Sequence, residues 1–368
     1  MRAVETIKNI WKIEDLRKRI LITLLLVLIY RFGTYIVLPG IDPKDLTALG
    51  EQTRGGLMAL LDMFSGGAFS NASIFALGIM PYISASIVMQ LAAIVIPSFQ
   101  KMQREGESGR RKINQWTRYL TVIVLILQGS AYLVNLNVQL RSAGASMPTD
   151  WWFRISSTII MAGGSMFVLW LGERITDKGI GNGISFIILI GIIARLPHSL
   201  FEEFTSRVTE KSGGLVMFLF EILFLLLVMA GAILLVQGTR KVVVQYAKRI
   251  IGNKQYGGAR QYIPLKVNAA NVMPIIFAQA IMFIPISLAG FSNSGENSSF
   301  MRAFMDNTGF WYNFVFALLI IAFTYFYTAI TINPTQMADD LKRNNGFIPG
   351  IKPGRATREY LDEIMSRI

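Results

Sequence analysis

The stretch LVMFLFEILFLLLVMAGAILLV, residues 215–236, contains one charged side chain, Glu221, among 22 positions. A helix of about 20 apolar residues is long enough to cross the hydrocarbon core of a bilayer. A helix that is apolar on all sides is buried in a large core or faces lipid. This stretch therefore predicts a membrane span and sets the fold class, an all-α membrane protein built as a multi-span helical bundle.

The composition agrees with a bilayer as solvent. Of 368 residues, 52% are hydrophobic and only 16% are charged, which is more apolar surface than one water-soluble core could bury. Eight segments are long and apolar enough, or nearly so, to be predicted as spans: Ile20–Pro39, Ser73–Ile96, Tyr119–Leu136, Ile155–Leu171, Ile184–Arg195, Leu215–Val236, Val272–Ala289 and Tyr312–Ile332.

The basic residues predict the orientation. With a cytoplasmic N-terminus, 27 of the 36 Lys and Arg residues fall in five cytoplasmic segments, which are 1–19, 97–118, 173–182, 237–268 and 333–368. Such an excess on one side is typical of the cytoplasmic loops of membrane proteins. The chain is therefore predicted to be multi-pass, with both ends of the sequence in the cytoplasm.

Three of these cytoplasmic segments have features of their own. Residues 1–19 are predicted to form an amphipathic segment with no cleavable signal. Segment 237–268 has seven basic and no acidic residues, which suits anionic lipid, RNA or an acidic protein. Segment 333–368 mixes both charges with three prolines and is predicted to be an ordered loop.

A short apolar stretch, Gly55–Phe64, lies between glycine pairs after the first predicted span. It is too short to cross the membrane. It is either a re-entrant, pore-occluding element or an amphipathic turn on the outer surface.

Catalytic chemistry is hard to find in this sequence. The chain has no Cys and one His, His198, so thiolate catalysis and Cys- or His-rich metal sites are excluded, and no cofactor is predicted. Arg31 and Glu221 are the main ionisable residues within predicted spans, and each is expected to pair or to reach an interface. The glycine-rich run 179–183 lacks the preceding strand of a nucleotide-binding loop.

Prolines predict bends in two of the spans. Pro81 lies in the second predicted span, and Pro274 and Pro285 lie in the seventh. Proline removes a helical hydrogen bond and kinks a helix. Two kinked helices are common in membrane bundles and are also what a gate requires.

Seven stretches together closely resemble the SecY family, the central subunit of the bacterial protein-conducting channel. They occur in the order that the family pattern has, and the resemblance covers essentially the whole chain. The stretches are FSGGAFSNAS (64–73), IFALGIMPYISAS (74–86), REGESGRRK (104–112), KGIGNGIS (178–185), YAKR (246–249), PLKVN (264–268) and FIPGIKPG (347–354).

The resemblance implies a channel of two pseudo-symmetric halves around an hourglass pore. The N-terminal half would be 20–196, with a plug at 55–72, and the C-terminal half 214–332, with 197–213 as the outer hinge loop. The implied hydrophobic pore ring consists of Ile79, Ile83, Ile184, Ile188 and Ile276. Members of each pair four residues apart lie on one helical face.

Further roles follow from the same resemblance. The plug residues would be Leu57, Met58, Leu60, Leu61, Met63 and Phe64. A lateral gate, opening between spans two and three on one side and seven and eight on the other, would include Ser84, Ile87, Gln90, Gln128, Phe277 and Ala280. Ribosome or motor binding would use Arg240, Lys241, Lys248, Arg249, Lys254, Lys352 and Arg355.

The implied partners are the small membrane subunits SecE and SecG, the motor ATPase SecA, the ribosome, polypeptides bearing signal sequences, and membrane lipids. The implied location is the bacterial cytoplasmic membrane. Any ATP hydrolysis would belong to SecA, so this chain is predicted not to be an enzyme.

The chain departs from the family pattern in three ways. Lys352 stands where Arg is common, which keeps the charge but loses the guanidinium fork. Asn253 stands where relatives often carry a basic residue. The pattern has ten spans where eight are predicted here, so either the sequence is part of a longer chain or a partner completes the pore.

The predicted function is a passive protein-conducting channel that translocates unfolded polypeptides and releases membrane segments laterally. The alternative is a secondary transporter of a small solute, which would need a polar or ionisable site near the midplane of the membrane. Near the midplane, the predicted spans contain mostly Ile, Met, Phe and Ser. This composition disfavours the transporter.

Overall fold

The computed structural model describes residues 11–43, 62, 65–142, 147–148, 150–209, 214–246, 249–251, 254–256, 260–279, 281–282 and 309–367. The chain divides into two compact units. The first comprises Met1–Glu203 with Gln279–Phe316, and the second Phe204–Ala278 with Ala317–Ile368.

The first unit is a helical bundle. Its helices are α2 (Glu14–Gly33), α5 (Met80–Val95), α6 (Pro97–Arg104), α7 (Glu107–Ser142), α8 (Trp151–Lys178) and α9 (Gly183–Ile193). Helices α5 and α8 pack against α7, while α2 and α9 pack against α8. Helix α10 (Leu196–Thr209) continues into the second unit, and α14 (Phe310–Thr331) also has residues in both.

The core of this bundle lies between α7, α8 and the residues that precede α5. Leu125, Leu136 and Leu140 of α7 and Met161 of α8 are almost fully buried there. Leu38 and Ala72 join the same cluster from outside the helices. In a bilayer the alternative to burial is contact with lipid tails, so close van der Waals packing holds these side chains together.

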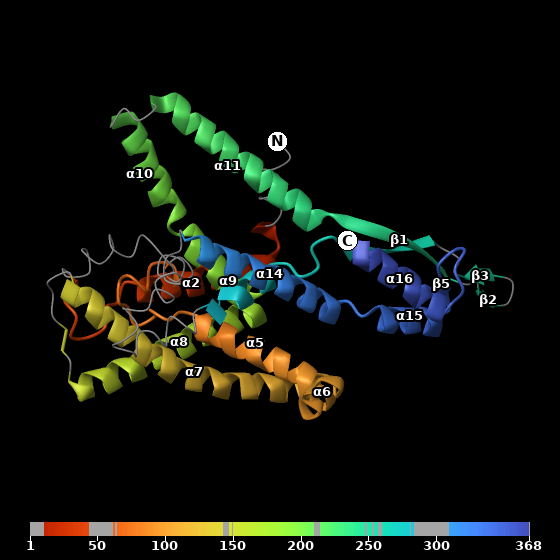
Figure 1. The fold of residues 1–368 in the computed structure, drawn as a ribbon, viewed down its shortest axis with the longest axis horizontal. Coiled ribbons are helices and arrows are strands. Elements are labelled where there is room, and N and C mark those ends of the chain that lie inside the picture. The colour runs from red at the N-terminus through yellow and green to blue at the C-terminus, as the bar shows by residue number, and fades with distance from the viewer. Residues whose placement is uncertain are drawn as a thin grey trace. The chain divides into compact units, whose positions relative to one another are not determined.

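The second unit contains the apolar helix α11 (Gly214–Gln237) and most of α14, together with small β-sheets and two amphipathic helices (Figure 1). The sheet elements are β1 (Thr239–Tyr246), β2 (Arg249–Ile251), β3 (Lys254–Tyr256), β4 (Arg260–Lys266) and β5 (Gly346–Phe347). The helices are α15 (Pro334–Arg343) and α16 (Arg355–Arg367).

Strands β4, β1 and β5 form one antiparallel sheet in that order, and we call this sheet with α15 and α16 the sheet module. Alternate β1 residues, Val242 and Val244, pack with Leu341 of α15 and with Leu361 and Ile364 of α16. The sheet module therefore has its own apolar core, to which α15 and α16 of the predicted segment 333–368 contribute.

Five helical stretches in the described residues are long and apolar enough to cross a membrane. They are Glu107–Arg141, Trp151–Lys178, Gly183–Arg207, Gly214–Gln237 and Phe310–Arg343. A sixth would be the pair Met80–Ala93 and Pro97–Gln103, which bends by 101° between its two parts. The predicted fold class of an all-α multi-span bundle is confirmed, with a small sheet that was not predicted.

Two predicted spans contain less helix than expected. The first, Ile20–Pro39, is helical only as far as Gly33, and Val37 beyond it forms a β-bridge with Ser73. The second, Ser73–Ile96, is helical only from Met80, with Pro81 in the first turn of α5. The residues before it, 66–79, form turns apart from the bridge at Ser73, and we call residues 65–79 the turn segment. Of the seventh, Val272–Ala289, residues 273–279 are helical and 283–289 lie outside the described residues.

The prediction of an outer loop at 197–213 was wrong for most of that range. Residues 196–209 form α10, which follows α9 after only two residues. Pro197 suggested a helix end, but proline is tolerated in the first turn of a helix, where its missing N–H has no intrahelical partner. The fifth span is accordingly longer than the predicted Ile184–Arg195.

Helix α8 holds the turn segment closely at Gly164. A Cβ atom added there would lie 2.2 Å from the backbone oxygen of Ile74, whereas one added to neighbouring Gly163 would meet nothing within 4 Å. We expect Gly164→Val to lower the free energy of unfolding by about 1–3 kcal/mol, because overpacking forces the backbone apart. Thermal unfolding of the purified protein in detergent measures this, and Gly163→Val is the control. Equal losses for both variants would contradict this packing.

Candidate functional site

The candidate site consists of the turn segment, residues 65–79, and the residues that contact it. The turn segment is almost completely buried. Ser65, Ala68, Ala72 and Ser73 are each exposed by 2% or less. Backbone hydrogen bonds join it to the chain beyond α2, from Leu38 N to Ala72 O at 2.9 Å and from Ile74 N to Ile36 O at 3.0 Å. Buried backbone groups are thereby satisfied although no regular helix is present.

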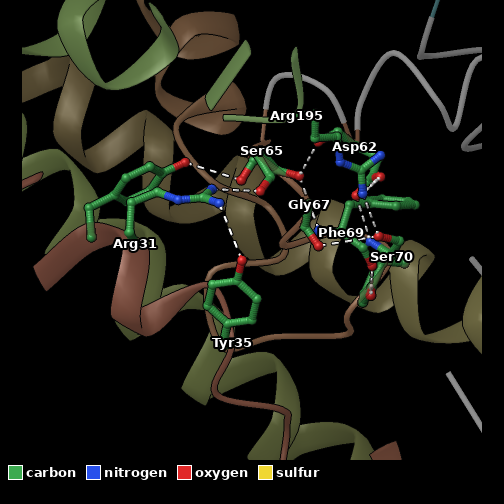
Figure 2. A network of polar contacts seen from close by, with 11 residues as sticks. Arg31, Tyr35, Asp62, Ser65, Gly67, Phe69, Ser70 and Arg195 are labelled. Carbon is green, nitrogen blue, oxygen red and sulfur yellow. Dashed lines mark hydrogen bonds and ion pairs between the residues drawn. The ribbon is translucent and has the colours of Figure 1, made fainter. Parts of the chain in front are cut away.

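Glycine makes the tight start of this segment possible. Gly66 and Gly67 have φ values of +67° and +92°, in the left-handed region that side chains with a Cβ rarely adopt. Their N–H and C=O groups can therefore turn toward Asp62 and Arg31, which lie on opposite sides of the segment (Figure 2).

Asp62 is the charged centre of the site. Its side chain is 2% exposed and forms an ion pair with Arg195, which lies between α9 and α10. The Ser70 N–H donates to Asp62 Oδ1 at 2.8 Å, and Arg195 Nη2 donates to Ser70 Oγ at 3.0 Å (Figure 2). The main chain of Asp62 also accepts hydrogen bonds, from Gly67 N at 2.9 Å and from Ser65 Oγ at 3.1 Å. A buried carboxylate is stable only when paired and hydrogen-bonded in this way.

Helix α2 holds the segment from another direction. Arg31 Nη1 donates to Gly66 O at 2.8 Å, and the Tyr30 hydroxyl donates to Ser65 O at 3.1 Å. The Arg31 guanidinium also lies 5.7 Å from the centre of the Tyr35 ring, within the range of a cation–π contact (Figure 2). Arg31, which was predicted to pair or to reach an interface, thus contacts Gly66 of the turn segment and Tyr35.

Helix α7 provides a third contact. The Tyr132 hydroxyl donates to Phe69 O at 2.8 Å, and the Tyr132 and Phe69 rings meet edge to face at 4.7 Å. Three separate parts of the bundle therefore fix the C-terminal part of the predicted plug, residues 65–72. The six plug residues named above, Leu57, Met58, Leu60, Leu61, Met63 and Phe64, lie outside the described residues.

Four of the predicted ring residues belong to the first unit. Ile79 caps the start of α5, and Ile83 N donates to Ile79 O at 3.1 Å, so the two residues share one face of the first turn. Ile184 and Ile188 are partly buried on α9, whose start is fixed by Asn182 Oδ1 accepting from Ile184 N at 3.1 Å. Ile276 is partly buried in the second unit. The ring as a whole stays a prediction.

The predicted lateral gate is likewise divided. Ser84, Ile87 and Gln90 lie on α5, and Gln128 lies on α7, the helix against which α5 packs. Phe277 is buried in the second unit, with its ring 5.4 Å from that of Phe323 of α14. Ala280 lies outside the described residues, and the gate stays a prediction.

The predicted docking residues fall on the sheet module and its β2–β3 hairpin. Arg240 and Lys241 are exposed on β1, and Arg249 and Lys254 belong to β2 and β3. Lys352 is exposed before α16, and Arg355 pairs with Glu359 at 2.9 Å. Lys248 lies outside the described residues. The basic residues are thus carried by a folded module where a loop was expected.

Sequence reasoning missed Asp62 and Arg195 as a pair. Asp62 was passed over within an apolar stretch, and Arg195 was noted only as the end of the fifth predicted span. A lone acid in an apolar stretch and a lone Arg at the end of a span were the available signals, because unpaired charges are costly in a membrane. The pairing expected of Glu221 is confirmed, since Arg207 Nη2 lies 2.6 Å from Glu221 Oε1.

These features define a multi-span α-helical membrane protein. Two solved structures share the fold, at 16% identity to this chain. The one described as "The structure of a protein conducting channel" has a TM-score of 0.64 and is matched over 95% of this chain and 82% of its own. One described as "The plug domain of the SecY protein stablizes the closed state of the translocation channel and maintains a membrane seal" has a TM-score of 0.62 and is matched over 95% of this chain and 81% of its own.

The chain belongs to the SecY family. The SecY family model matches residues 73–368. The chain is 42% identical to the protein translocase subunit SecY of Streptomyces scabiei, over 97% of this chain and 84% of that protein. It is 40% identical to the protein of the same name from Thermotoga maritima, over 99% of this chain and 84% of that protein.

Proposed function

We propose that this chain forms the channel of a protein translocase, which passes unfolded secretory polypeptides across a membrane and releases membrane segments sideways into lipid. The observation that carries the proposal is the 42% identity, over 97% of the chain, to a protein translocase subunit. The channel-type fold agrees with it.

The proposed pore has two closing parts. Ile79, Ile83, Ile184, Ile188 and Ile276 would form a ring of branched apolar side chains, which fits around a moving chain and resists ion flow by dewetting. The plug, 55–72, would close the pore further out, held by the contacts of its C-terminal part with Arg195, Arg31 and Tyr132.

We further propose that two pseudo-symmetric halves open between α5 and α7 on one side and the seventh and eighth spans on the other. The lateral gate would include Ser84, Ile87, Gln90, Gln128, Phe277 and Ala280. The orientation that fits the basic residues puts the N-terminus and the sheet module in the cytoplasm. The membrane would be the bacterial cytoplasmic membrane.

The proposed partners follow from the family. SecE and SecG would complete the membrane complex, and the ribosome or SecA would dock on the basic residues of the sheet module and the adjoining hairpin and supply the driving force. Contact with ribosomal RNA is supported by the seven basic and no acidic residues of segment 237–268.

The decisive test is site-specific photocrosslinking from position 83 to a stalled secretory chain, in membranes that contain the full-length protein and its small partner subunits. We expect an adduct that requires a functional signal sequence. Absence of the adduct together with active uptake of a small solute would favour the transporter instead. A photocrosslinker at exposed Val88 on the same helix serves as the control position.

A further inference from the structure

The sheet module has a strand edge that no other described strand covers. Strand β5 pairs with β1 only at Gln245 and Tyr246, whereas β4 pairs with β1 from Thr239 to Gln245. On the β5 side, the part of β1 from Thr239 to Val244 therefore lacks a neighbouring strand within the described part of the chain.

The hydrogen bonds between β1 and β4 show which backbone groups of β1 face the uncovered edge. Val267 N donates to Gly238 O at 3.0 Å, so this pair is hydrogen-bonded and every second pair along the ladder is too. Arg240, Val242 and Val244 consequently direct their N–H and C=O groups toward β4. The N–H and C=O groups of Lys241 and Val243 point the other way, to the uncovered edge.

A cavity lies along this edge. Its volume is about 420 Å³, and its lining includes Lys241 and Val243 of β1 together with Ile348 and Ile364. Both isoleucines belong to the core of the sheet module, so the apolar wall of the cavity is firmly held.

The cavity is strongly basic. Arg240, Lys241 and Arg260 line it, all three are exposed, and no lining residue is acidic. Among the described residues, no ion pair joins these three cations to a carboxylate. An uncovered strand edge beside an apolar wall is the arrangement that binds an extended peptide by adding a strand, with backbone hydrogen bonds for affinity and side-chain pockets for specificity.

We propose that the β1 edge, at Lys241 and Val243, binds an extended, acidic segment of a partner polypeptide as an added strand. A second copy of this chain is disfavoured as the occupant, since its net charge is +13 and like charges repel. RNA or a lipid headgroup would form ion pairs with the basic side chains. Neither would pair as a strand with the N–H groups of the uncovered edge or pack against the apolar wall of the cavity. The inference rests on the proposed docking role of this module, and a binding assay separates it from transport.

The test measures fluorescence anisotropy of a labelled ten-residue peptide of alternating Glu and Val, with the full chain and its small partner subunits in zwitterionic nanodiscs. We expect this peptide to bind at least about tenfold more tightly than one with Pro in place of a central Val, or one with Lys in place of Glu. Proline removes a backbone donor that an added strand needs, and Lys reverses the charge.

Variants of the chain test the edge itself. Val243→Pro removes the N–H at the uncovered edge without touching the β4 ladder and should weaken binding about tenfold, whereas Val243→Thr should leave it unchanged. Arg240→Gln should weaken binding as well.

If Val243→Pro does not fold, the comparison of peptides alone decides the question. The proposal is overturned if the acidic peptide does not bind or if the Pro-containing peptide binds equally well. It is also overturned if an RNA oligonucleotide binds with the same dependence on Arg240 and the peptide does not. Transport activity does not enter any of these outcomes.

Discussion

Replacing Arg195 with Gln is expected to raise the ion leak of the resting channel at least about fivefold. The change leaves the Asp62 carboxylate, 2% exposed, with the Ser70 N–H but without its counter-ion. Breaking a buried pair costs about 3–5 kcal/mol, and we lower this to about 1–3 kcal/mol because the Arg195 side chain is 45% exposed. A free energy of that size shifts the equilibrium between held and released turn segment by about 5- to 150-fold.

Single-channel or bilayer conductance of the purified complex measures this leak. Arg207→Gln is the matched control, because it removes another Arg–carboxylate pair, with Glu221, which belongs to the second unit. The double variant Asp62→Asn with Arg195→Gln should leak less than Arg195→Gln alone, because it no longer buries an unpaired charge. A leak that is unchanged in Arg195→Gln, or equal in Arg207→Gln, would show that the ion pair does not hold the channel closed.

Replacing Ile83 and Ile276 together with Asn is expected to hydrate the proposed constriction, raise the ion leak about tenfold or more and relax the selection of signal sequences. Dewetting of an apolar constriction is what blocks ions, and two amides bring water into it. Conductance measures the leak, and export of a reporter with a defective signal sequence measures selectivity.

The controls separate the ring from general damage to the helices. Ile83→Val with Ile276→Val keeps the constriction apolar and should behave as the wild type. Val88→Asn places an amide on the same helix at a position that is 50% exposed and should not increase the leak. Unchanged conductance and selectivity in the double Asn variant would count against the ring.

The parts of this fold that sequence predicted are those whose signal is local. A run of about 20 apolar residues can be recognised in the sequence of a single helix. The spans over α7, α8, α11 and α14 were therefore predicted correctly. The end of the fifth span was predicted less accurately, because Pro197 suggested a helix end where the chain continues as α10.

The parts that sequence missed depend on contacts between distant segments. Strand β1 reads TRKVVVQY, whose alternation is weak, and it becomes a strand because β4 and β5 pair with it from either side. Asp62 and Arg195 are far apart in the sequence, and neither residue alone indicates the other. The resemblance to the SecY family implied a channel with a plug. It did not indicate which residues contact the C-terminal part of that predicted plug.

The segments that form the sheet module are separated in the sequence, so they are synthesised at different times. Its central strand, β1, and its neighbour β4 are synthesised before α14, while β5, α15 and α16 come after it. The apolar core that joins Val242 and Val244 to Leu341 and Leu361 therefore cannot close until the intervening helix has emerged and been placed. A nascent chain whose later helices fail to insert would keep these valines uncovered, and quality-control proteases or chaperones could distinguish it from a finished channel by that exposed surface.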